Sequence, residues 1–348
     1  MEDIKVSVLC IAYNHEKYIS RCIDGFVNQK TNFKYEVIIH DDCSTDNTLQ
    51  IIKKYAEKFP NIINVISEEE NKYSKNIDII GDILFPKSAG KYIALCEGDD
   101  YWTDPLKLQK QYDAMENNPN VDICAHAVTK RRASNGRKVG AISPSKIETI
   151  FTISEVIAGG GGFVATNSLF YRRELLENQP EFRRYCLLDY ALQIQGALRG
   201  GMLYLPDNMA VYRVLVPGSW TSRLSKDTVA NRQAQALKIA KMLDMVNQET
   251  DGAYTDEIRR AKLDVAQALG IEKMLDMVNQ EADGAYTDVI RRAKLDIEFS
   301  RMESCGNYKA LRQGELLELY REKSLLWKMK TCLKEHFPWL LRLYRKYF

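Results

Sequence analysis

YIALCEGDDYW, residues 92–102, carries an apolar run straight into three carboxylates, those of Glu97, Asp99 and Asp100. Carboxylates so close together repel one another, and each would cost several kcal/mol if it were desolvated without a partner. A short apolar run of this kind is typical of a buried parallel strand, so the acids should lie where that strand ends. We therefore expect a positively charged group beside them.

Strands and helices alternate on both sides of this segment. The run VSVLCIA (6–12) predicts a buried strand, and an apolar stripe from Tyr18 to Val27 predicts a helix with Asn14 as its N-cap. Asp104-Pro105 predicts another helix start, a cap followed by proline. The other predicted strands are 35–39, 62–66, 91–96 and 121–128, and the other predicted helices are 46–59, 76–85 and 105–117. The alternation predicts an α/β fold with right-handed crossovers, a mostly parallel sheet and helices on both faces.

The alternation ends after residue 128. The turn signal Asn135-Gly136 predicts a hairpin, or an excursion over the site, at 127–142. Four glycines at 159–162 would permit close approach of a ligand to the backbone, but a mobile loop explains them equally simply. The segments that follow predict a strand and helix at 163–176, a helix from LLDYAL (187–192), and strands at MLYLP (202–206) and MAVYRV (209–214).

A direct repeat stands in the last third of the chain, which reads as helical from about residue 225. Residues 241–264 recur as 273–296. The copies differ only at Thr250/Ala282 and Glu257/Val289. We expect helices separated by a turn at DGAY, packed on each other or on a second subunit as a homo-oligomer. The sequence thus predicts two regions, an α/β domain at 1–222 and a helical region at 223–348.

The composition excludes several classes of protein. A net charge of +2 gives no nucleic-acid footprint. The eight cysteines are scattered without a CxxC pair, which is typical of reduced thiols in the cytoplasm, and the four histidines show no metal-ligand spacing. No apolar stretch approaches the length of about 18 residues that spans a bilayer, and Glu2 and Asp3 stand where a signal peptide would be basic.

The strand ends carry the polar residues. Ligands of open parallel sheets bind beyond the carboxyl ends of the strands, where this chain has AYN (12–14), HDDCSTDNT (40–48) and the acids of 97–100. Helix capping explains the later residues of the second motif but not its two adjacent acids. Neither GxGxxG nor GxxxxGK[ST] follows the first strand, which disfavours dinucleotide oxidoreductases and P-loop enzymes. A hard cation such as Mg²⁺ or Mn²⁺ on the acids of 97–100 remains the way to hold a nucleotide diphosphate.

Three motifs in this order resemble the nucleotide-sugar-binding half of family 2 glycosyltransferases, which have the GT-A fold. They are VSVLCIAYN (6–14), VIIHDDCSTDNT (37–48) and YIALCEGDDYWTDPLKLQKQ (92–111). The resemblance covers residues 4–117 and continues more weakly to residue 222, so it implies that 1–222 is the GT-A catalytic domain. It implies that Asp100 is the direct ligand of Mn²⁺ or Mg²⁺ and that Asp99 faces the ribose or sugar. The first carboxylate is displaced from a strict DxD motif, so Glu97 and Asp99 stay alternatives beside Asp100.

The resemblance also implies the other site residues. The implied nucleotide-sugar-binding residues, which would hold the uracil, ribose and sugar of a UDP-sugar, are Ala12, Tyr13, Asn14, Asp42, Asp99 and Trp102; the implied metal ligands are Asp100 and Asp99. For Trp102, packing is the alternative to lining the sugar pocket. Asp189 matches the position of the catalytic base, although capping of its helix is an alternative or additional role. Arg213 and Trp220 match donor or acceptor loops, and the missing QxxRW motif favours transfer of a single sugar.

The C-terminal segment 325–348 is basic and aromatic, with six Lys or Arg residues against one Glu. Such a stretch could lie on an anionic membrane surface, or it could be a helix docked on its own protein with a solvated basic face. A lipid-linked acceptor would favour the first, and the expected location is then the cytoplasm with peripheral contact at the inner face of the cell membrane.

The function that the resemblance implies is a metal-dependent, inverting transfer of one sugar from a UDP-sugar to a saccharide or lipid-linked acceptor of a surface polysaccharide. One alternative is a nucleotidyltransferase that makes nucleotide-sugars on a similar fold. These enzymes usually carry a glycine-rich basic loop after strand one, where this chain has AYNHEKY (12–18). The second alternative is a non-catalytic helical-repeat scaffold. The sequence leaves the donor sugar, the acceptor and the linkage open.

Overall fold

The computed structural model describes residues 3–75, 77–219, 222, 228–269, 272–281, 285–305, 307–324, 327–328 and 331. Its internal contacts divide the chain into two compact units. The first unit comprises residues 1–228 and 242–258, and the second comprises residues 229–241 and 259–348. The predicted boundary at residue 222 stays a prediction, since the chain crosses between the units more than once.

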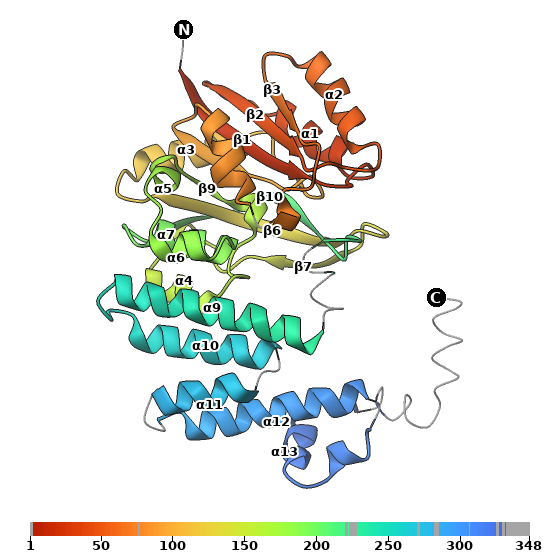
Figure 1. Ribbon diagram of the computed structural model, residues 1–348, viewed down its shortest axis with the longest axis vertical. Helices are drawn as coiled ribbons and strands as arrows, with labels where there is room; N and C mark the ends of the chain where they lie inside the picture. The colour runs from red at the N-terminus through yellow and green to blue at the C-terminus, as the bar shows by residue number, and fades with distance from the viewer. Residues whose placement is uncertain are drawn as a thin grey trace. The chain divides into compact units, whose positions relative to one another are not determined.

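A ten-stranded mixed sheet forms the first unit, in the order β3-β2-β1-β4-β9-β6-β10-β5, with β7 on β6 and β8 on β10 (Figure 1). Its strands are β1 Ile4–Ala12, β2 Lys34–Asp41, β3 Ile63–Ser67, β4 Tyr92–Leu95, β5 Tyr101–Trp102, β6 Ile123–Arg132, β7 Lys138–Ile142, β8 Thr149–Phe151, β9 Phe170–Arg172 and β10 Met202–Val214. The parallel pairings are those of β1 with β2 and β4, of β2 with β3, and of β6 with β10, and they include the longest pairings of the sheet. The predicted α/β class with a mostly parallel sheet is confirmed.

Helices cover this sheet and bury its apolar strands. They are α1 Ile19–Val27, α2 Thr48–Lys58, α3 Lys107–Asn117, α4 Ile153–Gly159, α5 Glu174–Glu177, α6 Glu181–Tyr185 and α7 Asp189–Ala197. Val8 of β1, Ile39 of β2 and Phe26 of α1 belong to one core cluster and are fully buried. Because strands covered on both faces need apolar side chains on both faces, the continuous runs in the sequence give buried strands.

Some predicted elements are wrong. Residues 76–85 do not form one α-helix: described segments there are a π-helix, Ile79–Leu84, between two short 3₁₀ turns, Tyr73–Lys75 and Phe85–Lys87. The Asp78 side chain is the N-cap of the π-helix and accepts a hydrogen bond from Gly81 N at 3.0 Å, so this helical segment begins only at Ile79. The two strands predicted at 202–214 are one strand, β10. The hairpin predicted at 127–142 is confirmed as β6 and β7, and Gly136 turns it with φ 67°.

Both predicted helix caps are also wrong. Asn14 has a positive φ of 56° and is not the N-cap of α1, which begins at Ile19 after Tyr18. α3 begins at Lys107 with Leu106 as its N-cap, and the Asp104 side chain instead accepts a bond from Leu106 N at 2.8 Å. In both cases the polar residue organises the turn before the helix rather than the first helical turn.

Each copy of the direct repeat contributes to two helices. The first copy covers the end of α9 (Val229–Glu249) and the start of α10 (Thr255–Leu269); the second covers α11 (Glu272–Glu281) and the start of α12 (Thr287–Ser304). Positive φ values at Asp251 and Gly252 make the predicted turn in the first copy, whereas residues 282–284 of the second lie outside the described residues. A shorter helix, α13 (Leu316–Glu322), follows. No helix among the described residues is long and apolar enough to cross a bilayer.

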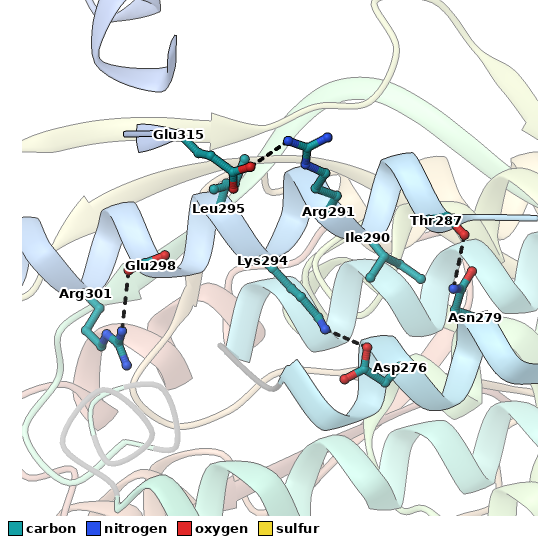
Figure 2. A pocket seen from close by; sticks show the side chains of 10 residues that line it. All are labelled: Asp276, Asn279, Thr287, Ile290, Arg291, Lys294, Leu295, Glu298, Arg301 and Glu315. Atoms are coloured by element: carbon teal, nitrogen blue, oxygen red, sulfur yellow. Dashed lines mark hydrogen bonds and ion pairs between the residues drawn. The ribbon is translucent and has the colours of Figure 1, made fainter. Parts of the chain in front are cut away.

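A cavity of about 550 Å³ lies in the second unit beside α11 and α12 (Figure 2). Its charged side chains are paired with one another: Lys294 with Asp276 at 2.6 Å, Arg291 with Glu315 at 2.6 Å, and Arg301 with Glu298 at 3.9 Å. Paired, solvent-exposed charges of this kind leave no excess charge for a substrate. The acids singled out from the sequence lie in the first unit instead.

Within the first unit, the first repeat copy contacts helix α4 through a glutamate that the second copy lacks. Ser154 of α4 donates a hydrogen bond to Glu257 Oε1 at 2.9 Å. At the equivalent position the second copy has Val289, which is 55% exposed. Replacing Glu257 by Val should lower the free energy of unfolding by about 1 kcal/mol and Tm by a few degrees. Val289→Glu is the control, and at its exposed site it should change stability by less than about 0.5 kcal/mol. Equal Tm values for Glu257→Val and wild type in thermal unfolding would show that the contact is unimportant.

Candidate active site

The loops after β1, β2 and β4 meet at one edge of the sheet. Parallel register places Ala12 beside Asp41 and Leu9 beside Leu95. The loop backbones continue the pairing, since Gly98 N donates to Ile11 O at 2.9 Å and Asp42 N donates to Ala12 O at 2.9 Å. The three motifs therefore come together as predicted from the rule that parallel strands present their carboxyl ends at a common edge.

Glu97, Asp99 and Asp100 form an acid cluster, with one carboxylate oxygen of each within 4.8 Å of the others. Asp99 and Asp100 are buried, and Glu97 is exposed. Burial, and then the charge of Asp99, raises the pKa of Asp100. Desolvation, followed by the charges of Asp99 and Asp189, raises the pKa of Glu97 even though part of the side chain is open to solvent. Among the described residues no basic side chain forms an ion pair with these carboxylates. Three mutually repelling oxygens without a cationic partner fit a divalent cation.

Asp100 is held from two sides. Its Oδ1 accepts a hydrogen bond from Arg213 N at 2.7 Å, and its Oδ2 accepts one from Asn167 Nδ2 at 3.0 Å. The Arg213 guanidinium donates to the backbone carbonyl of Asp99 and lies 4.4 Å from the ring centroid of Tyr101. The Arg213 guanidinium is the positive group expected beside the acids, but it bonds to the backbone of Asp99, and only the backbone N–H of Arg213 bonds to a carboxylate, that of Asp100.

Asp189 lies next to this cluster. It is the first residue of α7, with Leu188 as the N-cap, and its Oδ2 accepts a hydrogen bond from Thr166 Oγ1 at 2.6 Å. Burial raises its pKa, against the opposing effects of the Thr166 hydroxyl, the Tyr190 backbone N–H and the charge of Arg183. Its charge acts on Glu97, so the structure brings the predicted base and the predicted metal site together. The catalytic role of Asp189 stays a prediction.

The loop after β1 presents one exposed ring. Ala12 is fully buried, and Tyr13 is 44% exposed. Asn14 joins two loops, because its side-chain oxygen accepts a bond from Thr45 N at 2.8 Å and its N–H donates to Ser44 Oγ at 2.9 Å. Tyr13 is thus free to stack on a ligand, whereas Asn14 is engaged in holding the loop.

The two adjacent acids after β2 differ in their surroundings. Asp42 uses both carboxylate oxygens to accept bonds from the backbone N–H groups of Lys72, at 2.7 Å, and Tyr73, at 3.1 Å. Asp41 accepts a bond from Ser44 N at 3.0 Å, and in the part of the chain that the structure describes its buried Oδ1 has no hydrogen-bond partner. A ligand N–H would satisfy that oxygen. The nucleotide-binding role of Asp42 stays a prediction. Asp41 is a second candidate for that role, and the sequence did not indicate it.

Trp102 is 3% exposed and packs in the core. Its ring lies 4.8 Å from that of Phe26 and 4.0 Å from the Lys107 ammonium group, and its Nε1 donates to Asn167 O at 3.0 Å. These contacts agree with the packing alternative, and a role in lining a sugar pocket stays untested. Thr166 bonds to Asp189 and Asn167 bonds to Asp100. No motif in the sequence indicates either residue. Trp220 lies outside the described residues.

The chain has recognisable relatives. The model of Glycosyl transferase family 2 matches residues 7–178. An uncharacterised protein of Mycobacterium tuberculosis is 35% identical over 251 residues, which are 70% of this chain and 69% of that protein. An uncharacterised glycosyltransferase of Nostoc is 26% identical over 251 residues, 70% of this chain and 74% of that protein. The poly(ribitol-phosphate) beta-glucosyltransferase of Bacillus spizizenii is 32% identical over 137 residues, 39% of this chain but 20% of the relative.

Solved structures agree at the level of the fold. The crystal structure of S. aureus TarS, residues 1–349, in complex with UDP-GlcNAc superposes with a TM-score of 0.51 at 19% sequence identity. The match covers 86% of this chain and 92% of that one. At such low identity the likeness establishes a shared GT-A architecture, as the three motifs predict, and nothing about the substrate.

Proposed function

Because the chain belongs to glycosyltransferase family 2 and is a glycosyltransferase of GT-A fold, we propose that it transfers one sugar from a UDP-sugar to a saccharide or lipid-linked acceptor, with inversion and with a divalent cation. The observation that carries the proposal is the acid cluster Glu97, Asp99 and Asp100 at the strand edge, without a basic partner among the described residues. Relatives named for poly(ribitol-phosphate) and teichuronic acid glycosyltransferases support a role in cell-surface polysaccharide synthesis.

The acid cluster would hold Mn²⁺ or Mg²⁺, which prefer hard oxygen ligands. Asp100 is oriented by Arg213 N and Asn167, and none of the described residues donates a hydrogen bond to the carboxylates of Glu97 and Asp99. All three acids therefore have at least one oxygen lone pair for an ion. When bound, the cation would neutralise charge on the diphosphate leaving group. Arg213 adds a positive charge beside the same edge.

Asp189 would act as the base. In its ionised form it would take the proton of the acceptor hydroxyl while that oxygen bonds to the anomeric carbon and the bond from this carbon to UDP breaks. Burial raises the basicity of Asp189, and the hydrogen bond from Thr166 keeps the ionised form accessible. We further propose that the exposed Tyr13 ring stacks on uracil, with Asp42 or Asp41 as the acceptor of its N–H.

Transfer assays with a panel of UDP- and GDP-sugars test this proposal. We expect turnover of a UDP-sugar with Mn²⁺ or Mg²⁺, loss of turnover in EDTA, and recovery when the ion is restored. Asp100→Ala should raise the Mn²⁺ concentration needed for half-maximal activity by about 100-fold, the scale on which metal-site residues act. An Asp100→Ala variant with full activity would contradict the metal assignment.

The same assays separate the alternatives. A nucleotidyltransferase would release pyrophosphate, and a scaffold would show no affinity for UDP in calorimetry and tight partner binding through residues 225–348. Family membership and the intact acid cluster disfavour both.

The remaining expectations stay proposals. They are the catalytic domain at 1–222, oligomerisation through the helices of 223–348, and a cytoplasmic location with peripheral membrane contact through 325–348, most of which lies outside the described residues.

A further inference from the structure

One short turn bonds to both Asp189 and Asp100. The 3₁₀ turn Thr166–Ser168 lies between α4 and β9. Thr166 Oγ1 donates to Asp189 Oδ2 at 2.6 Å, and the next residue, Asn167, donates from Nδ2 to Asp100 Oδ2 at 3.0 Å. Neighbouring residues of one turn therefore hold the predicted base and the predicted metal ligand, which are 89 positions apart in the sequence.

Buried side chains bond to the backbone carbonyls of this turn. Trp102 Nε1 donates to Asn167 O at 3.0 Å, and Gln111 Nε2 donates to Ser168 O at 2.9 Å. Lys107 Nζ in turn donates to Gln111 Oε1 at 2.7 Å. Lys107 and Gln111 are fully buried, so water cannot easily replace these bonds. The turn is thus a rigid support and not a loose connection.

The side-chain amide of Asn167 is oriented so that its nitrogen faces Asp100, which costs stability because its oxygen is left without a hydrogen bond from the described residues. Its Nδ2 donates to two acceptors, Asp100 Oδ2 and the backbone carbonyl of Val211, each at 3.0 Å. Its Oδ1 is buried and has no hydrogen-bond partner among the described residues. A buried acceptor left unpaired costs about 1–3 kcal/mol. The amide nevertheless faces Asp100 with its donor, because the reverse orientation would bring an oxygen against two acceptors.

We propose that Thr166 and Asn167 are positioning residues that fix Asp189 and Asp100 relative to each other, so that the proton acceptor and the donor site keep a set separation. This inference rests on the proposed function. The two residues act on different groups, since Thr166 orients the base and Asn167 orients a carboxylate of the acid cluster. The side chain of Ser168, in the same turn, donates from its Oγ to Ala165 O at 2.6 Å and, among the described residues, bonds to neither acid.

Separate roles predict separate defects. Thr166→Val keeps the shape of the side chain but removes the donor, so kcat should fall about 10- to 100-fold while Mn²⁺ affinity in the presence of UDP, measured by calorimetry, stays unchanged. Thr166→Ser should restore kcat. Asn167→Ala should weaken Mn²⁺ binding about 10- to 100-fold, and kcat should recover at saturating Mn²⁺. Ser168→Ala is the matched control and should leave both quantities within about threefold of wild type.

The outcomes distinguish the possible failures. If wild type neither transfers a sugar nor binds Mn²⁺ with UDP, the proposed function falls and the positioning roles fall with it. If wild type does both, but Thr166→Val, Asn167→Ala and Ser168→Ala lower kcat and Mn²⁺ affinity by one common factor, the turn serves only the fold and this inference alone is wrong. Should Asn167→Ala lose its folded circular dichroism spectrum, Asn167→Ser, which stays polar but is too short to reach Asp100, should show the same Mn²⁺ defect.

Discussion

Replacing Asp189 by Asn should lower kcat by about a thousandfold, within the range that a positioned general base contributes. Asparagine has nearly the same shape, so the acceptor should still bind, but its amide cannot take up the proton of the acceptor hydroxyl. UDP affinity and the Mn²⁺ requirement should stay close to wild type, because the acid cluster is untouched. Initial rates over a range of donor and acceptor concentrations measure the effect.

The same substitution separates catalysis from stabilisation of the helix start. Asp189 is the first residue of α7 and follows the N-cap Leu188, so its charge there is worth at most about 1 kcal/mol. If that were its only role, Asn would lower Tm by a few degrees and leave kcat almost unchanged. The control is Glu181→Gln, which neutralises an exposed acid at the first residue of the neighbouring helix α6. If Asp189→Asn retains more than about a tenth of the wild-type kcat, the base lies elsewhere and Glu97 becomes the next candidate.

The fold could be predicted from the sequence where one local pattern dominates. The run at 6–12 gave a buried strand because a sheet covered on both faces needs apolar residues on both faces of each strand. The segment 76–85 has the right apolar content for a helix, and Asp78 caps a helical segment there through Gly81 N, but the backbone takes a wider π turn that the apolar pattern does not distinguish from an α-helix. The predicted caps at Asn14 and Asp104 were wrong because a polar residue before a helix is a cap only if its side chain reaches the first turn.

Of the candidate site, only the residues that directly follow strands in the sequence could be predicted. Glu97, Asp99 and Asp100 are neighbours in the sequence, so their clustering needs no knowledge of the fold. Thr166 and Asn167 approach these acids only because β9 inserts between β4 and β6, a non-local pairing that no periodicity reports. Asp41 and Asp42 have different environments because Asp41 is the last residue of β2 and Asp42 the first residue of the loop after it.

The burial of Lys107 is another feature that could not be predicted from the sequence. On an amphipathic helix a lysine is expected on the solvated face. Here Lys107 is fully buried at the start of α3, with its ammonium group 4.0 Å from the Trp102 ring centroid and bonded to Gln111. None of the described carboxylates forms an ion pair with it. Burial lowers its pKa from the usual 10.5 to about 7.

Lys107→Met should therefore change stability in a pH-dependent way. Between about pH 7 and 10.5 the unfolded chain binds the proton that the folded chain has lost, so this lysine makes the wild type more stable as the pH rises. Below pH 7 both states are charged, and burial of the charge costs about 5 kcal/mol. Relative to wild type, the variant should therefore lose several kcal/mol of stability between pH 6 and pH 10, and it should be the more stable protein near pH 6 and the less stable one near pH 10.

Denaturant unfolding of both proteins at several pH values measures this crossing. Lys110→Met is the matched control on the same helix, because Lys110 is paired with Asp104 and Asp207 and these partners raise its pKa. A base with a raised pKa stabilises the fold equally at all pH values below its unfolded pKa, so the effect of Lys110→Met should be constant from about pH 6 to 9. A constant effect of Lys107→Met over the same range would mean that Lys107 stays charged at its buried position beside Trp102. The Gln111 side chain that bonds to Ser168 would then itself be bonded to a buried cation.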